Sequence, residues 1–504
     1  MKIGIIGSGV SGLSAAAFLA RARHRVVLFE QAGDIGGVTA GLQKDGYRWD
    51  LGQMLLGDLG PGEPGRRALD RLGVSDKVEL VPSSRGNVFP DFQFWKPGGP
   101  PIPGGRRSFL KGFFPTDAAG IERYYALYER MHDLSALQSR TGLAAKVRLL
   151  LKFLPIRKMK TWSARRLMDA FFADHRLKAV YTSILADYVT KPEDFPGLLL
   201  PLINAEQQYD ERQPLEYGGH EHRSSWGYIR GGCARLVSAL ADAILAAGGE
   251  IRTNVCVEKV LVGEGAAKAL RLEDGSEEPF DAVVASGGAK ELFRGLVGAE
   301  NLPADFVASR VDNLATTESV FMVHLGVDYD AAACQHGSAL CYYYLSYDVD
   351  GAIEECSRGV YHEGRHGFLV YIPSVHSPEM APPGHQAVTV YTIAPNEPTN
   401  GAWSVDSGKW ADILLGLAER YVPGLRAHEK TRVVLTPEYF RARTRLARHA
   451  FGGCPPRLDR SPPPHKTPIR GLWFVGAQSE AYGGVTGGIL SGQKAAEGIL
   501  RERR

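Results

Sequence analysis

The chain has 504 residues, a length that predicts two or three domains and excludes a single small module. Hydrophobic residues make up 44% of it and charged residues 23%, which is typical of a globular protein and excludes a disordered, collagen-like or coiled-coil chain. The formal net charge is only +3, so bulk charge gives no reason to expect nucleic acid as a partner.

The cysteines and the start of the chain bear on the cellular compartment. Six cysteines are scattered without a Cys-x-x-Cys pair or a Cys/His spacing, so we expect no metal site and no disulfide framework. Met1-Lys2 leads straight into an apolar strand pattern instead of a secretory signal, and no apolar run reaches about 18 residues. We therefore expect a cytoplasmic protein, with any membrane contact peripheral and on the inner face.

The first predicted elements are a strand, a tight turn and a helix. Residues 3–6 are apolar, Gly7, Gly9 and Gly12 follow with GxGxxG spacing, and residues 13–22 are rich in Ala and Leu. Gly7 permits the turn, Gly9 lets a pyrophosphate approach the backbone, and Gly12 lets the helix pack closely on the strand. The helix N-terminus then faces the anion, so the pattern favours a dinucleotide-binding unit.

A second apolar strand ends at Glu30, about 20 residues beyond the glycine turn, where a carboxylate can bind the ribose of an adenosine. The pair Gly36-Gly37 follows, and then an aromatic-Asp-Leu-Gly run at residues 49–52. This combination resembles the FAD-binding start of the flavin amine oxidase superfamily. Val38 stands where that superfamily often carries Arg or Lys, so a cationic contact to the cofactor is absent or comes from elsewhere.

A basic amphipathic segment comes next, because residues 134–168 contain no acid and many cations. Within it an apolar stripe has helical spacing, and Arg148 and Lys152 point away from that stripe; its members are Leu143, Val147, Leu150, Leu151 and Leu154. Two interpretations stay open: the stripe packs on the protein's own core, or the helix lies on an anionic membrane. We hypothesise that residues 143–160 dock the protein on bilayers or open the entrance to a substrate channel.

The middle of the chain repeats the signs of a nucleotide-binding domain. After Gly231-Gly232 we predict, in order, a helix at residues 236–247, an alternating strand at 250–261, a hairpin turn at Asp274-Gly275 and a buried strand at 280–286. In the superfamily that the first motifs resemble, such a unit completes the FAD domain, and the position that matches Val257 contacts the adenine through its backbone.

Several side chains are candidates for chemistry, although no spacing assigns them. His220, His222 and His324 could act as acids or bases near pH 7, but a histidine with a purely structural role is commoner, so no catalytic residue is assigned. The tyrosines at 342–344 and Tyr347 could line an apolar tunnel, and they equally suit a packed sheet.

The approach to the C-terminus resembles one branch of the superfamily, which contains bacterial phytoene desaturases, carotenoid isomerases and retinol saturases. The run Pro373 to His385 is similar to their P-S-x-x-D-P-x-x-A-P-x-G run. Residues 436–438, 451–453 and 462–468 match the same branch. These blocks, together with the N-terminal ones, span nearly the whole chain.

The last predicted elements are a strand at residues 471–475 that ends at Gly476-Ala477, a glycine-rich turn at 483–488 and a helix at 489–500. This looks like the closing FAD motif of the superfamily, in which a helix N-terminus points at the flavin. Ala477 replaces the acidic residue of many relatives.

The expected fold is α/β: a discontinuous Rossmann-like FAD-binding domain (GR2 type) with an α+β substrate domain. We assign residues 1–70, 216–290 and 456–504 to the FAD-binding domain, and residues 71–215 and 291–455 to the substrate domain. The resemblance implies FAD as cofactor, bound by Gly7, Ser8, Gly9, Val10, Ser11, Gly12, Glu30, Gln31, Gly36, Gly37, Val38, Val257, Gly476, Ala477, Gly484 and Val485.

The resemblance also implies an FAD-dependent oxidoreductase that desaturates, saturates or isomerises a long apolar polyene or lipid, such as a carotenoid or retinoid. One alternative is a flavin amine oxidase acting on a polar amine or amino acid. A second is a non-redox lipid carrier or escort protein of the same fold, against which the intact glycine motif and Glu30 speak.

Overall fold

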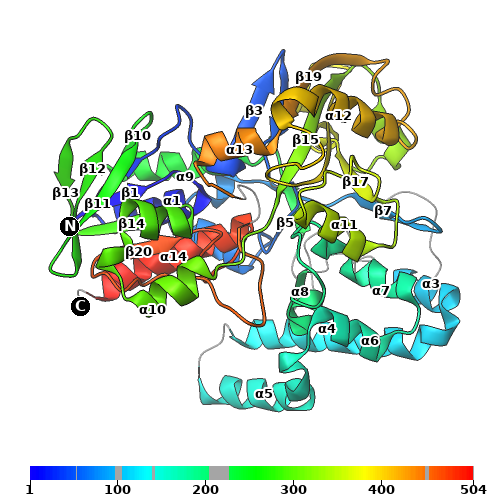
Figure 1. The fold of residues 1–504 in the computed structure, drawn as a ribbon, viewed down its shortest axis with the longest axis horizontal. Helices are drawn as coiled ribbons and strands as arrows, with labels where there is room; N and C mark the ends of the chain where they lie inside the picture. Colours follow the sequence, from blue (N-terminus) through cyan, green and yellow to red (C-terminus); the bar gives the residue numbers. More distant parts are fainter. Residues whose placement is uncertain (53, 97–104, 139–141, 204–225, 449–452, 503–504) are drawn as a thin grey trace.

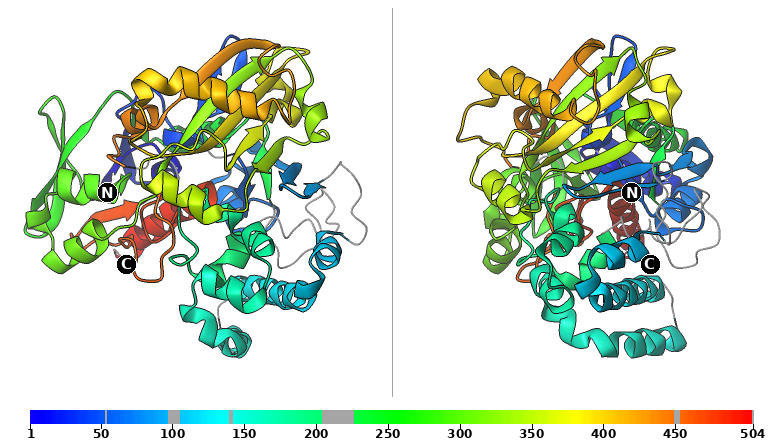
Figure 2. Two further views of the ribbon diagram at one scale, coloured as in Figure 1. Left: turned by 45° about the vertical axis from the view of Figure 1, so that its right-hand side comes forward. Right: turned by 90° about the vertical axis from the view of Figure 1, so that its right-hand side faces the viewer.

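The computed structural model describes residues 1–52, 54–96, 105–138, 142–203, 226–448 and 453–502 (Figures 1 and 2). His220, His222 and the motif residues Phe451 and Gly452 lie outside the described residues, as does the predicted domain boundary between residues 215 and 216. Within the described ranges, no helix is both long enough and apolar enough to cross a membrane.

A five-stranded sheet forms the layer that carries the N-terminus. All of its strands run parallel, in the order β10-β2-β1-β14-β20. Their bounds are β1 Lys2–Ile6, β2 Arg25–Phe29, β10 Glu250–Arg252, β14 Ala282–Ser286 and β20 Leu472–Val475. Distant parts of the chain thus meet in one sheet, whose central strands are continuous apolar runs because both faces are covered.

The two faces of this sheet pack against different layers. Ile3, Ile5 and Leu28 lie on one face with three helices, α1 Val10–Arg21, α9 Ala234–Ala246 and α14 Val485–Arg501. Val27 and Val283 lie on the other face, against the antiparallel sheet of β11 Val257–Gly263, β12 Ala266–Leu272 and β13 Glu277–Pro279. A parallel sheet between such layers confirms the predicted α/β, Rossmann-like fold class.

The predicted continuous strand at residues 250–261 is wrong, because the structure divides it. β10 ends at Arg252 and joins the parallel sheet, whereas β11 starts at Val257 and joins the antiparallel one. Asn254, between them, has φ of 56°, a left-handed conformation that interrupts a strand. Alternation of apolar residues continues across the break, which is why the pattern hid it.

A seven-stranded sheet, β19-β15-β18-β17-β16-β7-β8, forms the second large layer. Its bounds are β7 Arg85–Val88, β8 Gln93–Lys96, β15 Ser319–Val327, β16 Leu340–Tyr344, β17 Gly367–Tyr371, β18 Gln386–Ala394 and β19 Glu429–Leu435. Trp403 and Trp410 of α12, Trp403–Ala418, cover one face. The opposite face packs towards Met54, Leu55 and Tyr228.

A helical layer lies at the end of the molecule opposite α12 (Figures 1 and 2). It consists of α3 Gly105–Phe113, α4 Ala118–Gln138, α5 Leu143–Phe153, α6 Ala164–Phe171, α7 His175–Thr182 and α8 Leu200–Ile203. Its core is rich in aromatic residues, including Tyr124, Phe172 and Tyr181, all buried. A 3-10 segment, Leu154–Thr161, continues α5.

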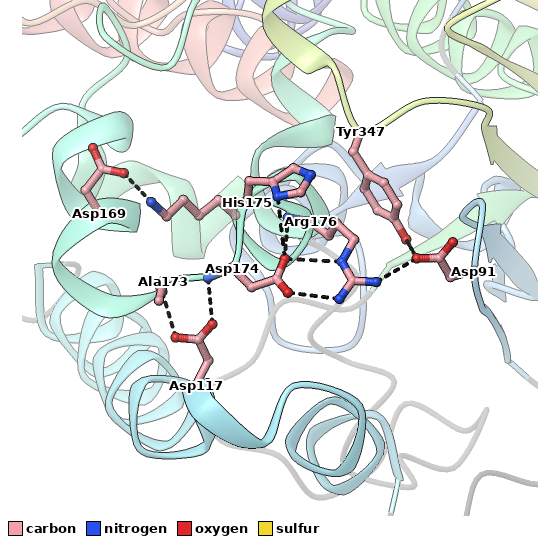
Figure 3. A network of polar contacts seen from close by, with 9 residues as sticks. Asp91, Asp117, Asp169, Ala173, Asp174, His175, Arg176 and Tyr347 are labelled. Atoms are coloured by element: carbon pink, nitrogen blue, oxygen red, sulfur yellow. Dashed lines mark hydrogen bonds and ion pairs between the residues drawn. The ribbon is translucent and has the colours of Figure 1, made fainter.

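Polar contacts connect the helical layer to the seven-stranded sheet (Figure 3). Asp174 caps the N-terminus of α7 and binds Arg176, which also pairs with Asp91 at 3.0 Å, in the turn between β7 and β8. Asp117 accepts hydrogen bonds from the backbone N–H groups of Ala173 and Asp174 at 2.7 and 2.9 Å. These contacts hold the start of α7 against both α4 and the sheet.

The remaining elements are short. The strands are β3 Gly41–Lys44, β4 Tyr47–Asp50, β5 Leu56–Gly57, β6 Leu80–Pro82 and β9 Trp226–Ile229; the helices are α2 Pro64–Leu72, α10 Ala304–Phe306, α11 Val349–Ser357 and α13 Pro437–Thr444. The hydroxyl of Thr436 caps α13 by accepting from the backbone N–H of Tyr439. This cap stabilises the start of α13.

Candidate cofactor and substrate site

A cavity opens where four parallel strands end, at the carboxyl edge of the five-stranded sheet. Its lining includes the last residues of β1, β2 and β14 and the residue that follows β20, and it holds about 1650 Å³ of empty space, part of it open to solvent. Open α/β sheets bind their ligands at this edge, because the loops that leave it carry backbone N–H groups and helix N-termini. We call it the cofactor cavity.

The structure brings fifteen of the sixteen predicted site residues together around this cavity. They come from the glycine turn, the end of β2, the Gly36-Gly37 pair, the start of β11, the end of β20 and the start of α14; in full they are Gly7, Ser8, Gly9, Val10, Ser11, Glu30, Gln31, Gly36, Gly37, Val38, Val257, Gly476, Ala477, Gly484 and Val485. Gly12 alone does not line it.

Gly12 acts behind the cavity wall instead. A Cβ at this position would lie 2.1 Å from the carbonyl oxygen of Gly7 and 3.3 Å from the Cβ of Ser286. No side chain fits at 2.1 Å, so only glycine lets α1 approach the turn after β1 this closely. Gly12 therefore has the packing role that the spacing predicted, without contact to the cavity.

Glu30 is buried at the end of β2 and organises the turn across from it. Its carboxylate accepts hydrogen bonds from the backbone N–H of Ser8 at 2.8 Å, from the Ser8 hydroxyl at 2.5 Å and from the backbone N–H of Ala32 at 2.9 Å. A carboxylate offers about four acceptor positions, so one stays available on the cavity side for a ribose hydroxyl.

Two helix N-termini border the cofactor cavity. Gly9 precedes α1 and Gly484 precedes α14, and the first turn of each helix contains no acidic residue. Unpaired N–H groups and the helix dipole favour an anion there. A Cβ at Gly287 or Gly484 would meet no atom within 4 Å, so these glycines leave open space that a bound group can fill. The residues present thus fit a pyrophosphate-containing cofactor.

The cationic residues of the cavity come from α13 and were missed by the sequence reasoning. Arg443 and Arg445 line the cavity. Arg443 donates from Nε to the carbonyl oxygen of Gly37 at 2.7 Å and pairs with Asp34 at 2.9 Å. A cation from a distant segment therefore contacts the glycine pair, next to which Val38 stands. The alternating arginines at positions 441, 443 and 445 were the sequence signal that could have indicated these cationic residues.

A second cavity lies between the seven-stranded sheet and the helical layer. Its empty space is about 540 Å³, part of it open to solvent. We call it the tyrosine cavity after Tyr342, Tyr343, Tyr344 and Tyr391, which line it with Phe368, Leu369 and Ile393. The predicted tyrosine cluster thus lines a cavity, although Tyr347 lies outside it and its hydroxyl faces Asp91 at 3.5 Å. His324 lines neither cavity; burial lowers its pKa to about 3.

An apolar layer connects the two cavities. Val38, which lines the cofactor cavity, packs in one cluster with Tyr342, Leu369 and Tyr391, which line the tyrosine cavity. Met54 and Leu55 belong to the same cluster. Side chains of one apolar cluster therefore border both cavities.

A buried polar chain borders this layer. The hydroxyl of Tyr371 lies 2.9 Å from Nε2 of His376, whose Nδ1 lies 2.8 Å from the Ser377 hydroxyl. Asp50 accepts from the backbone N–H of Cys233 at 2.7 Å, and burial raises its pKa to about 6. Burial lowers the pKa of His376 to about 3, so this histidine is neutral at pH 7. These buried polar contacts fasten β4 and α9 to the seven-stranded sheet.

The Rossmann-like sheet, the glycine turn, the acidic strand end and the two helix N-termini define a dinucleotide-binding protein. A family model described as flavin containing amine oxidoreductase matches residues 10–500, so the chain belongs to that family. The protein is an FAD-dependent oxidoreductase. This excludes the alternative that it is a non-redox lipid carrier or escort protein.

Three comparisons illustrate the range of similar proteins. The chain is 24% identical to a lycopene-forming phytoene desaturase of Pseudescherichia vulneris, over 99% of both chains. It is also 24% identical to prolycopene isomerase 1 of an Oncidium hybrid cultivar, over 99% of this chain and 83% of the isomerase. A structure of putrescine oxidase bound to putrescine superposes with a TM-score of 0.63 at 15% identity, over 99% of both chains, which shows a shared fold. The predicted resemblance is confirmed.

Proposed function

We propose that this enzyme acts on C–C or C=C bonds of a long apolar polyene or lipid, such as a carotenoid or retinoid, by desaturation, saturation or isomerisation. The tyrosine cavity, joined to the cofactor cavity by an apolar layer, is the observation that carries the proposal. An apolar chain buries its surface against such rings, whereas a short polar amine leaves them unfilled. The desaturase and isomerase names of similar proteins support this substrate class.

We also propose how the chain holds FAD. The fifteen lining residues named above would contact it, with the pyrophosphate at the N-terminus of α1, an adenosine ribose at Glu30 and the adenine along the backbone of Val257. Arg443 extends this set, because it reaches the glycine pair from α13. Bound FAD supplies hydride and electron transfer, so the chain has only to bind, orient and enclose the substrate.

The aromatic part of the tyrosine cavity suits an uncharged ligand. His362 lines it, and burial lowers the pKa of this histidine to about 3, so the imidazole carries no charge at pH 7. Burial also raises the pKa of Tyr391 well above its usual value, which keeps that phenol protonated. The neutral rings favour an apolar ligand along this part of the wall, while Asp187 and Asp348 line another part of the cavity. We propose further that the enzyme is cytoplasmic and takes its substrate at the inner face of the membrane.

Anaerobic mixing of the purified holoenzyme with candidate substrates tests the proposal. A polyene that the enzyme desaturates bleaches the flavin absorption, a polyene that it saturates restores the absorption of pre-reduced enzyme, and isomerisation changes the geometry of the polyene while the flavin spectrum stays constant. Bleaching by a soluble amine, with peroxide released on admission of air and no change with any polyene, would contradict the proposal and favour the amine oxidase alternative.

A variant locates the reaction. Ala186 lines the tyrosine cavity, and Ala186→Phe places a ring in it. We expect the rate with polyene to fall at least tenfold, while the flavin spectrum and the melting temperature of the holoenzyme stay close to those of the wild type. Ala308→Phe is the matched control, because Ala308 is exposed and lines neither cavity. Equal rates in both variants would exclude the tyrosine cavity as the substrate site.

A further inference from the structure

We propose that α5 and the 3-10 segment after it form a docking surface for an anionic lipid bilayer. The surface consists of the apolar side chains Leu143, Val147, Leu150, Leu151 and Leu154 and of the cationic side chains Lys146, Arg148, Arg157, Lys158 and Lys160. This proposal rests on the proposed function in one respect: the purpose of docking is to bring the enzyme to a substrate dissolved in lipid.

The apolar side chains of α5 face solvent. No residue of α5 is buried, and the exposed fractions of Leu143, Leu150 and Leu151 are 79%, 58% and 61%. Among the described residues nine large apolar side chains are exposed, and five of these belong to this one surface. Exposed apolar side chains gathered in one place mark an interaction site, whereas single ones need no explanation.

The helix is attached to the protein by its other side. Leu149 and Phe153 pack on the aromatic core of the helical layer, and Lys152 pairs with Asp133 of α4. At about 100° per residue, the five exposed apolar side chains fall within an arc of roughly 100° that is turned away from these anchors. Figures 1 and 2 show α5 as the outermost helix of its layer, so this arc is free to meet a flat surface.

The positive charge of the docking surface indicates that the membrane it meets is anionic. Lys146 and Arg148 flank the apolar arc on its two sides, and Lys158 and Lys160 extend it along the 3-10 segment, all of them exposed. Within the described residues these four cations form no ion pair, and α5 with its 3-10 continuation contains no acidic residue. An apolar stripe between cations is the arrangement of helices that lie in the interface of anionic membranes.

Vesicle flotation with the holoenzyme, in the absence of substrate, tests the docking surface. We expect the wild type to float with phosphatidylcholine vesicles that contain phosphatidylglycerol at low salt, and at least tenfold less with phosphatidylcholine alone or at high salt. The double variant L150E/L151E removes the apolar contact and should lower binding at least tenfold. The triple variant K146Q/R148Q/K158Q should lose the preference for phosphatidylglycerol.

Val405→Glu is the matched control, because Val405 is 80% exposed on α12, outside this surface. Flavin absorption and melting temperature confirm that each variant is folded. Failure of the wild type to float at low salt overturns the proposal, as does equal loss in the control. A wild-type dimer that L150E/L151E converts to a monomer without vesicles also overturns it and assigns the surface to a second copy.

Flotation and catalysis can fail separately. If the wild type floats and no polyene reacts, the docking surface stands and the proposed substrate is wrong. If a polyene delivered in detergent reacts and the wild type does not float, the substrate stands and the docking surface is wrong.

Discussion

Helices α1 and α5 are alike in length and apolar content, yet they have opposite environments. Eleven of the twelve residues of α1, from Val10 to Ala20, are buried, because the helix lies between the parallel sheet, α9 and α14. The eleven residues of α5 include none that is buried. An apolar helical pattern thus predicts the helix in both cases, but it does not tell which neighbour, protein or lipid, its apolar side chains meet.

The difference can be traced to small and charged residues. Glycines and alanines in α1 let other backbones approach, as Gly12 does at Gly7 and as Gly492 of α14 does at the carbonyl oxygen of Ser11, where a Cβ would lie at 2.5 Å. Helix α5 instead carries cations on two flanks of its apolar arc, which keep that arc at the surface. Close packing of helices, as at α1, requires small residues. A helix at the protein surface, such as α5, tolerates long charged residues.

The largest effect of a single substitution should come from truncating the buried helix. Leu13 is fully buried in α1, so Leu13→Ala should lower the free energy of unfolding by about 2–5 kcal/mol through lost burial and a residual cavity. Denaturant unfolding of the holoenzyme measures this. A loss below about 1 kcal/mol would mean that the interior around α1 relaxes to fill the space.

Acid should weaken the buried interior, whereas α5 contains no histidine and no acidic residue. Burial lowers the pKa of His324, His362 and His376 from 6.5 to about 3, so between these values the unfolded chain binds more protons than the folded one. Stability then falls with pH below 6.5, by about 2 kcal/mol per histidine at pH 5. Asp50, with its raised pKa, opposes this in part.

Melting temperatures from pH 7 to 5 check the histidine prediction. His175→Gln serves as the control, because its side chain is 83% exposed and should leave the pH dependence unchanged. A melting temperature that is constant or rises on acidification contradicts the assignment of neutral, buried imidazoles.

A single added methyl group should disrupt the close approach of α1 to the glycine turn. Gly12→Ala places a Cβ 2.1 Å from the Gly7 oxygen, which we expect to destabilise the protein by about 1–3 kcal/mol and to release FAD on desalting. Flavin absorbance per polypeptide gives the readout. In contrast, Gly408→Ala in α12 meets no atom within 4 Å and should stabilise by about 0.5–1 kcal/mol. Retention of FAD by Gly12→Ala would argue against the close approach.

The smallest effect should come from the outward helix. Leu150→Ala in α5 removes the same atoms as Leu13→Ala, but the side chain is 58% exposed, so unfolding should change by no more than about 0.5 kcal/mol. Parallel denaturant curves of the two variants give the ratio of their effects. A large loss in Leu150→Ala would show that α5 is covered by protein in solution.

Local motifs predicted fifteen of the residues that line the cofactor cavity, at the glycine turn, the end of β2, the Gly36-Gly37 pair, the start of β11 and the closing turn. Arg443 could not be found in this way, because it reaches Gly37 from more than 400 residues along the chain. The division of residues 250–261 was hidden as well, because alternation is the same in β11 and across the break at Asn254. The assignment of domain limits stays a prediction.

Sequence spacing alone determined strands β1, β2, β14 and β20, the glycine turn and the amphipathic helix at residues 143–153, because steric limits at glycine and the helical period act over a few residues. Tertiary structure decided the rest. It placed Arg443 where Val38 leaves no cation, joined the tyrosine cavity to the cofactor cavity through one apolar layer, and turned Leu150 outward. Each of these depends on contacts between segments far apart in the chain, which local patterns do not encode.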